Sequence, residues 1–158
     1  MKKLMILGIL SMFIFYSCST SNSVALDRSS QRDVRGTWNL DRVSYSENMV
    51  KVKAFDEYDA QCLKNSVWYF IANNNKGNFT LQGGNTCPAL TQNFTWYIDK
   101  QNMLVLKLLN EGDRARKVTT GTTYLYEILS ENEFKLSQVI SGVTITYHFS
   151  KLASGKLK

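Results

Sequence analysis

Eight short runs of alternating apolar and polar residues follow one another between residues 36 and 151, and they constrain the fold of this 158-residue chain more than any other feature. The runs are rich in aromatic and β-branched residues and are separated by polar turns, a pattern typical of β-strands. One proline, Pro88, occurs in the sequence. The pattern predicts little helix and strands at residues 36–46, 65–73, 77–83, 92–99, 103–109, 122–130, 133–140 and 143–151.

The predicted hairpins bring apolar residues opposite one another. This is a test of register, because a slip by one residue would turn every side chain to the other face. The expected pairs are Phe70–Phe79, Trp68–Leu81, Ile98–Leu104, Trp96–Leu106, Phe94–Leu108, Leu136–Tyr147 and Phe134–Phe149.

The opposite face of the last predicted strand is polar and carries Thr144, Thr146, His148 and Ser150. Consecutive antiparallel strands with one apolar and one polar face are best satisfied by an up-and-down barrel, because closure removes the unpaired edges. We therefore expect an all-β, eight-stranded antiparallel barrel. A sandwich of two sheets is the alternative.

The N-terminus has the features of a secretory signal at residues 1–17. Lys2 and Lys3 precede an apolar stretch at residues 4–16, which is shorter than the ~20 residues that a membrane span needs. Ser17-Cys18 follows it and resembles a bacterial lipobox. The resemblance implies that Cys18 carries a lipid; an ordinary signal with a chance cysteine is the alternative.

Polar residues dominate residues 18–35, which we expect to form a flexible tether between the lipidated Cys18 and a folded domain at residues 36–158. No acidic residue directly follows Cys18. This favours an outer-membrane lipoprotein that faces the periplasm over one exported to the surface.

Three cysteines leave one pair once Cys18 is assigned to the lipid: Cys62 and Cys87. Extending the first hairpin register places the two opposite each other, so we expect a disulfide in an oxidising compartment. The sequence offers few candidate metal ligands, because His148 is the single histidine and no Cys-x-x-Cys spacing occurs. We expect no metal and no cofactor.

The net charge of +6 falls to +4 when Lys2 and Lys3 leave with the signal. The densest basic group, at residues 114–117, lies beside Glu111 and Asp113 and has no aromatic residue for stacking. We therefore expect a solvated loop there and no nucleic-acid partner.

Gly36-Thr37-Trp38 stands at the start of the first predicted strand, and Gly-x-Trp at this place in an eight-stranded barrel resembles the lipocalin signature. Residues 35–151 resemble the compact lipocalin-like lipoproteins of Bacteroidota, although Ser130-Glu131-Asn132-Glu133 replaces the family's Thr-Asp-Tyr motif. The resemblance implies that Gly36 lets the chain enter the barrel closely. It also implies that Trp38 plugs the closed end beneath a cation, here Lys151.

An eight-stranded barrel is either filled by its own side chains or holds one small ligand. The aromatic residues expected to face inward would fill much of the interior. A shallow apolar pocket at the open end is the functional interpretation, and its candidate residues are Trp68, Phe70, Trp96, Tyr126 and Tyr147. The segment 49–63, with a short helix at 54–60, lies where lipocalins carry their lid.

Catalytic groups find little support in the sequence. His148 has only Thr146 and Ser150 beside it on the outer face, and Asp56, Glu57 and Asp59 are typical of a solvated acidic surface. We expect no enzyme. Two functions stay open: a lipid-anchored binder of a small hydrophobic ligand, and a lipid-anchored scaffold or accessory subunit that docks with another envelope protein.

Overall fold

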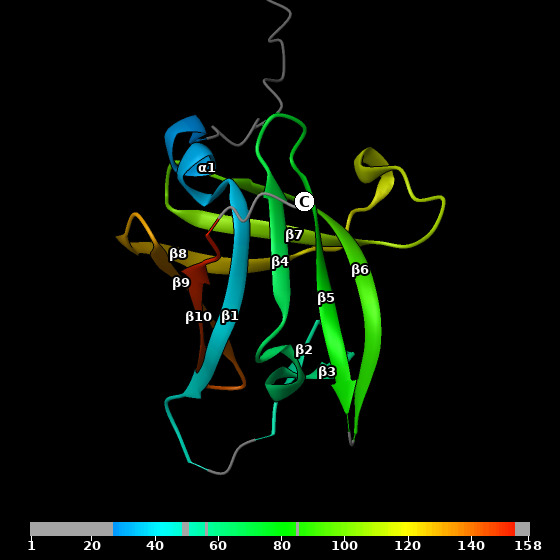
Figure 1. Cartoon of the computed structure of the whole chain (residues 1–158), viewed down its shortest axis with the longest axis vertical. Coiled ribbons are helices and arrows are strands. Elements are labelled where there is room, and N and C mark those ends of the chain that lie inside the picture. Colours follow the sequence, from blue (N-terminus) through cyan, green and yellow to red (C-terminus); the bar gives the residue numbers. More distant parts are fainter. Residues whose placement is uncertain (1–26, 49–50, 56, 85, 154–158) are drawn as a thin grey trace, which may run out of the picture.

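Eight antiparallel strands form a closed barrel in the computed structural model, which describes residues 27–48, 51–55, 57–84 and 86–153 (Figure 1). The barrel strands are β1 (Gly36–Tyr45), β4 (Val67–Ile71), β5 (Lys76–Gly84), β6 (Cys87–Ile98), β7 (Met103–Leu109), β8 (Thr122–Ser130), β9 (Glu133–Ile140) and β10 (Val143–Lys151). Their order is β1-β10-β9-β8-β7-β6-β5-β4, and β1 bonds to both β10 and β4. The predicted barrel is confirmed, and the sandwich is excluded.

The two later hairpins have the predicted registers. Phe94 lies opposite Leu108 across β6 and β7, and Leu136 lies opposite Tyr147 across β9 and β10. The side chains of Leu136 and Tyr147 are buried, while the polar residues of β10 lie on the half-exposed outer face. The main difference in strand length is in β6, which begins at Cys87 and not at residue 92.

The predicted register of the β4–β5 hairpin is wrong by two residues. Trp68 lies opposite Phe79, and Phe70 lies opposite Gly77. A Cβ atom at Gly77 would stand 2.4 Å from the ring of Phe94, so the glycine leaves space for that ring. The shift is by an even number of residues, and the same side chains therefore stay inside the barrel.

A turn at residues 72–75 causes this shift. Asn75 adopts a left-handed backbone with φ 55°, which asparagine tolerates better than most residues. Asn74 Oδ1 accepts a hydrogen bond of 3.1 Å from the backbone N–H of Lys76. The strand β5 consequently starts at Lys76, one residue earlier than predicted.

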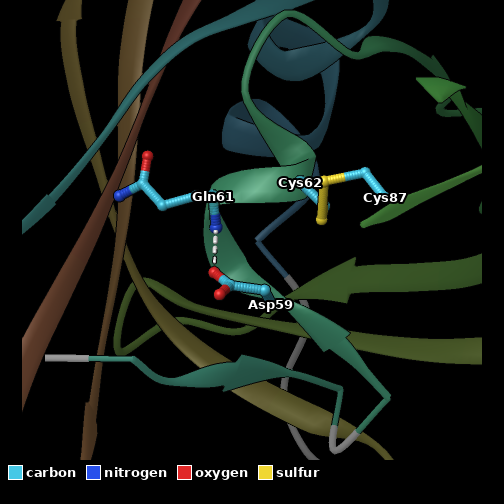
Figure 2. The surroundings of a disulfide bond; sticks show 4 residues. All are labelled: Asp59, Gln61, Cys62 and Cys87. Atoms are coloured by element: carbon cyan, nitrogen blue, oxygen red, sulfur yellow. Dashed lines mark hydrogen bonds between the residues drawn. A yellow bond between two sulfur atoms is a disulfide. The ribbon is translucent and has the colours of Figure 1, made fainter. Parts of the chain in front are cut away.

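The predicted helix at residues 54–60 is displaced. Two short strands, β2 (Lys53–Ala54) and β3 (Tyr58–Asp59), pair there, and a 3₁₀-helix, η1, follows at Ala60–Leu63. The side chain of Asp59 caps η1 by accepting a hydrogen bond of 2.9 Å from the N–H of Gln61 (Figure 2). A second 3₁₀-helix, η2 (Ala115–Lys117), lies in the loop between β7 and β8.

A helix, α1 (Arg28–Val34), replaces part of the predicted tether at residues 18–35. Its N-cap residue Asp27 accepts hydrogen bonds from the hydroxyls of Ser30 (2.6 Å) and Ser29 (2.7 Å). These bonds lower the pKa of Asp27 to about 2, with Ser30 making the largest contribution. Such caps are worth about 1 kcal/mol, which helps a short helix to form in a polar sequence.

Contact with the barrel fixes α1 in place. The side chain of Val34 is fully buried, and its carbonyl accepts a hydrogen bond of 2.7 Å from Trp38 Nε1. The N–H of Asp27 donates to the carbonyl of Ile98 at 2.8 Å. A flexible tether is thus wrong for residues 28–34, while residues 18–26 lie outside the described residues. Within the described residues, no helix is long and apolar enough to cross a membrane.

Trp38 plugs the end of the barrel that α1 covers, which we call the closed end (Figure 1). The tryptophan is 2% exposed and meets the ring of Phe134 edge-on, with centroids 4.6 Å apart. The Nζ atom of Lys151 stands 5.2 Å from the centre of the indole ring, within the range of a cation–π contact. The predicted arrangement of Trp38 and Lys151 is confirmed. Gly36 lies in the same strand, with φ +128°.

We predict that Trp38→Ala lowers the free energy of unfolding by about 3–5 kcal/mol, because it removes buried area and leaves a cavity. A domain of this size has a total of about 5–15 kcal/mol. The control Lys151→Met should cost at most about 2 kcal/mol, the upper range of a cation–π contact. Denaturant titration of both variants measures the difference, and a Trp38→Ala variant as stable as the parent would contradict this role of Trp38.

Candidate ligand site at the open end of the barrel

The end of the barrel opposite α1, called here the open end, carries η1 and the β2–β3 hairpin (Figure 1). A cavity of about 10 Å³ lies beneath these elements, with room for about one water molecule. It is lined by Leu40, Phe55, Leu63, Trp68, Leu106, Tyr124, Leu136, Tyr147 and Phe149. The atoms that face the cavity are apolar.

Phe55, in the turn between β2 and β3, covers this cavity. Its ring stacks on Phe79, with centroids 5.9 Å apart, and meets Tyr124 edge-on at 6.3 Å. Its backbone has φ 57°, in the left-handed region that non-glycine residues rarely adopt. The side chain of Phe55 therefore closes the open end in the way that Trp38 closes the other end.

Two of the residues that line the cavity, Tyr124 and Tyr147, carry a hydroxyl group. The hydroxyl of Tyr147 accepts a hydrogen bond of 3.0 Å from Gln138 Nε2, and the rings of Tyr147 and Tyr124 meet edge-on at 5.8 Å. Burial is the main cause that raises the pKa of both hydroxyls. Both stay protonated at neutral pH, so the Tyr147 hydroxyl keeps a proton that it can donate to a ligand.

Of the five residues predicted to form the pocket, the structure brings Trp68 and Tyr147 to the cavity. The other three, Phe70, Trp96 and Tyr126, lie nearer the closed end. Phe70 pairs with Gly36 and packs against Trp96 with centroids 5.2 Å apart, and Tyr126 packs against Phe134 at 5.7 Å. Alternation correctly placed all five inside the barrel, but it carries no information about depth along the barrel axis.

Sequence reasoning missed the residues that complete the cavity. Tyr124 precedes Tyr126 by two positions and points inward by the same alternation, so the sequence did contain a signal for it. The sequence contains no such signal for Phe55, because this residue lies in an irregular connection, where alternation does not predict which side chains face inward. Its place over the cavity depends on a turn that only the folded chain forms.

A model of the lipocalin-like domain family matches residues 34–136, more than half of the chain. The chain belongs to the lipocalin-like domain family. The match begins at Val34, where α1 ends, and stops inside β9, so β10 completes the barrel beyond the matched part. Comparison with curated proteins and with solved structures finds no match.

One disulfide joins Cys62 and Cys87 at the open end of the lipocalin-like barrel, as predicted, with Cα atoms 5.4 Å apart (Figure 2). The route to it differs from the prediction. Cys62 lies in η1 and not in β4, and Cys87 lies opposite Gly84 in the β5–β6 hairpin. The bond attaches η1, and with it the cavity residue Leu63, to the rim of the barrel.

We predict that replacing both Cys62 and Cys87 by serine lowers the free energy of unfolding by about 3.5 kcal/mol on the chain-entropy model, since the bond joins residues 25 positions apart. Denaturant titration measures the loss. Alkylation of the unreduced, denatured parent protein, mapped by peptide mass spectrometry, should leave both cysteines unmodified. Labelling of both would show that the bond does not form in the mature protein.

His148 lies on the outer face of the barrel, away from the cavity. Arg42 Nη2 stands 3.3 Å from its Nδ1, and Ser44 Oγ stands 3.2 Å from its Nε2. Burial, then Arg42 and Lys135, lower the pKa of His148 and favour its neutral form. A shift of register after Leu40 turns Arg42 outward, where simple alternation would have pointed it inside.

The acidic residues predicted as a solvated surface are only partly described. Glu57 is exposed, Asp59 caps η1, and Asp56 lies outside the described residues. Across the described ranges, no three His, Cys, Asp or Glu side chains come together as metal ligands would.

Proposed function

We propose that the protein is a lipid-anchored binder of a small hydrophobic ligand, which enters the barrel at its open end. The observation that carries the proposal is the apolar cavity covered by a single aromatic side chain, Phe55. Lipocalin-like barrels suit small hydrophobic ligands because their interior is a continuous apolar space. In this barrel, the space beneath Phe55 becomes available to a ligand when the side chain of Phe55 moves away.

The energy that holds Phe55 in place is modest. Its two aromatic contacts contribute about 0.5–1.5 kcal/mol each beyond burial. A left-handed backbone at a non-glycine residue costs about 1–2 kcal/mol, which is released when the turn relaxes. The strain offsets part of the aromatic contacts, and a ligand that buries as much apolar surface as the ring of Phe55 replaces the burial that is lost. Such a ligand can therefore displace Phe55 without unfolding the barrel.

The hydroxyl groups of the two lining tyrosines are the polar groups that a ligand could reach once Phe55 has moved. With Tyr147 accepting from Gln138, its own proton can be donated to a carbonyl or hydroxyl oxygen of the ligand. The ligand class is therefore a mainly apolar molecule with one acceptor group. Tyrosines that remain protonated at neutral pH suit binding and not nucleophilic chemistry, which supports our further proposal that the protein is not an enzyme.

We predict that an uncharged naphthylamine dye binds the parent protein and binds Phe55→Ala about tenfold more tightly, because the dye then displaces no side chain; tenfold corresponds to about 1.4 kcal/mol. Dye fluorescence during titration measures both dissociation constants. The control Tyr69→Ala removes an exposed aromatic ring from the outer face of β4 and should leave the affinity unchanged. Equal affinities of Phe55→Ala and the parent would rule out the cavity as the binding site.

The anchor is the second part of the proposal. Ser17-Cys18 lies outside the described residues, and its support is the resemblance to a lipobox after an apolar leader. Two or three acyl chains, at about 0.8 kcal/mol per buried methylene, attach a protein stably where one chain does not. We propose an outer-membrane protein that faces the periplasm, where a disulfide such as Cys62–Cys87 persists.

We predict that Cys18→Ala moves the protein from the membrane fraction to the soluble fraction, because no thioether can form. Fractionation with immunodetection measures the distribution. Cys62→Ala is the matched control: it also removes one cysteine but leaves the anchor, so it should stay with the membrane. Full membrane retention of Cys18→Ala would refute the lipid anchor and leave the ligand site untouched.

Docking with another envelope protein is the second candidate function. The outer face of β8 and β9 exposes Leu125 and Val139, which are 48% and 68% exposed. Both point away from the barrel interior, on neighbouring strands. Native mass spectrometry of protein from its own cells distinguishes the candidates, because a retained small molecule supports the binder and a co-purifying subunit supports docking.

A further inference from the structure

The helix α1 and the turn from β4 to β5 both lie at the closed end of the barrel (Figure 1). A groove of about 850 Å³ lies between them. Arg28, Gln31, Arg32 and Arg35 line it from the helix side, and Asn75 lines it from the turn. The spacing of three and four residues places Arg28, Gln31 and Arg32 on one face of α1, and Arg35 follows the helix as its C-cap residue. The groove is at the other end of the molecule from the proposed ligand cavity and is independent of it.

Three arginines line this groove, and none of them forms an ion pair with a carboxylate among the described residues. In the described part of the chain, the one ion pair within 4 Å joins Lys135 and Glu127, at 3.1 Å. The nearest acidic residue on the N-terminal side, Asp27, is engaged by its two serines. Asp33, on the same helix, is not among the residues that line the groove. The groove is therefore cationic.

Gln31 adds a second, independent observation. Its side chain is 5% exposed, and its Oε1 accepts a hydrogen bond of 3.5 Å from Asn75 Nδ2. Its Nε2 is buried and has no hydrogen-bond partner among the described residues. Buried amide groups nearly always have partners, so the unused donor of Gln31, a residue that lines the groove, is available to an acceptor that reaches it.

We propose that this groove binds a phosphate group, either of a lipid headgroup or of a phosphorylated molecule in solution. Donors dominate the lining: three guanidinium groups carry the charge, and the amides of Gln31, Asn73 and Asn75 accompany them. A phosphate offers several acceptor oxygens and more negative charge than a carboxylate, and arginine pairs with it through two parallel hydrogen bonds. The occupant is therefore an anion with more than two acceptor oxygens.

The position of the groove suits a headgroup if the chain is anchored as proposed. From residue 18 to residue 27 the chain can span at most about 30 Å when fully extended, at ~3.3–3.6 Å per residue. The groove then lies within reach of the membrane surface, where anionic headgroups attract basic groups. The phosphate site itself does not depend on the anchor, and the experiment separates the two sources of phosphate.

Chemical footprinting of the full chain tests the proposal with a dicarbonyl reagent that modifies arginine. Modification is followed by peptide mass spectrometry at Arg28, Arg32 and Arg35, with Arg114 and Arg116 in the exposed η2 loop as internal references. The probes are inorganic phosphate, sodium chloride at matched ionic strength, vesicles of phosphatidylcholine, and vesicles that also contain phosphatidylglycerol.

We predict that modification of the three groove arginines slows several-fold while the references keep their rates. Protection by inorganic phosphate but not by chloride identifies a soluble phosphate ligand. Protection only by the phosphatidylglycerol vesicles identifies a headgroup. Equal protection of the groove arginines and the reference arginines, or no protection by any probe, overturns the site. Neither result tests the dye-binding cavity or the release of Cys18→Ala from the membrane.

Two variants test the roles of individual groups. Arg32→Gln changes an exposed side chain and should weaken the protection of Arg28 and Arg35, whereas Arg116→Gln should not. Gln31→Leu removes the unused donor, so we expect a higher thermal midpoint without phosphate and weaker protection with it. If Gln31 had a purely structural role, Gln31→Leu would change the thermal midpoint alone. Unchanged protection of the groove arginines in Gln31→Leu would overturn the assignment of Gln31 as a phosphate ligand.

Discussion

Closure of the barrel at β1 is the constraint on which the rest of the structure depends. In this strand, Trp38 lies opposite Lys151 of β10 on one side and opposite Trp68 of β4 on the other. The strand therefore joins the first and last parts of the chain through backbone hydrogen bonds, and no unpaired edge remains in the ring. β1 pairs with β4 over residues 36–39, and the shift of register after Leu40 lets the strand follow the curve of the barrel while its pairing with β10 continues to Tyr45.

Closure of the barrel encloses an interior, and aromatic side chains fill most of it. Trp68 alone packs against Phe70, Phe79, Phe94 and Phe149, at centroid distances from 4.5 to 6.0 Å. The rings fill the closed half and leave about 10 Å³ near the open end. Ligand capacity in this protein is thus a question of which side chain moves, and Phe55 is the one held by few contacts on a strained turn.

The two ends of the barrel differ in chemistry. The open end is apolar, carries the disulfide and is covered by Phe55. The closed end is sealed by Trp38 and α1, and its outer side presents the arginines of the groove. An apolar site and an anion site at opposite ends would let one small domain contact a hydrophobic ligand and a phosphate-bearing surface at the same time.

The sequence by itself determined the strands, because alternation with period two and polar turns are local properties that need no tertiary contact. It also identified Trp38 with Lys151 and the pairing of Cys62 with Cys87, although the ladder used to justify that pairing was wrong. Tertiary structure decided where along the barrel axis each inward-facing side chain lies. Phe70, Trp96 and Tyr126 face inward as predicted, but they fill the closed half of the barrel. It also decided the roles of Phe55 and α1, since a left-handed turn and a helix with one buried apolar residue are stabilised by contacts with the barrel and leave no period in the sequence.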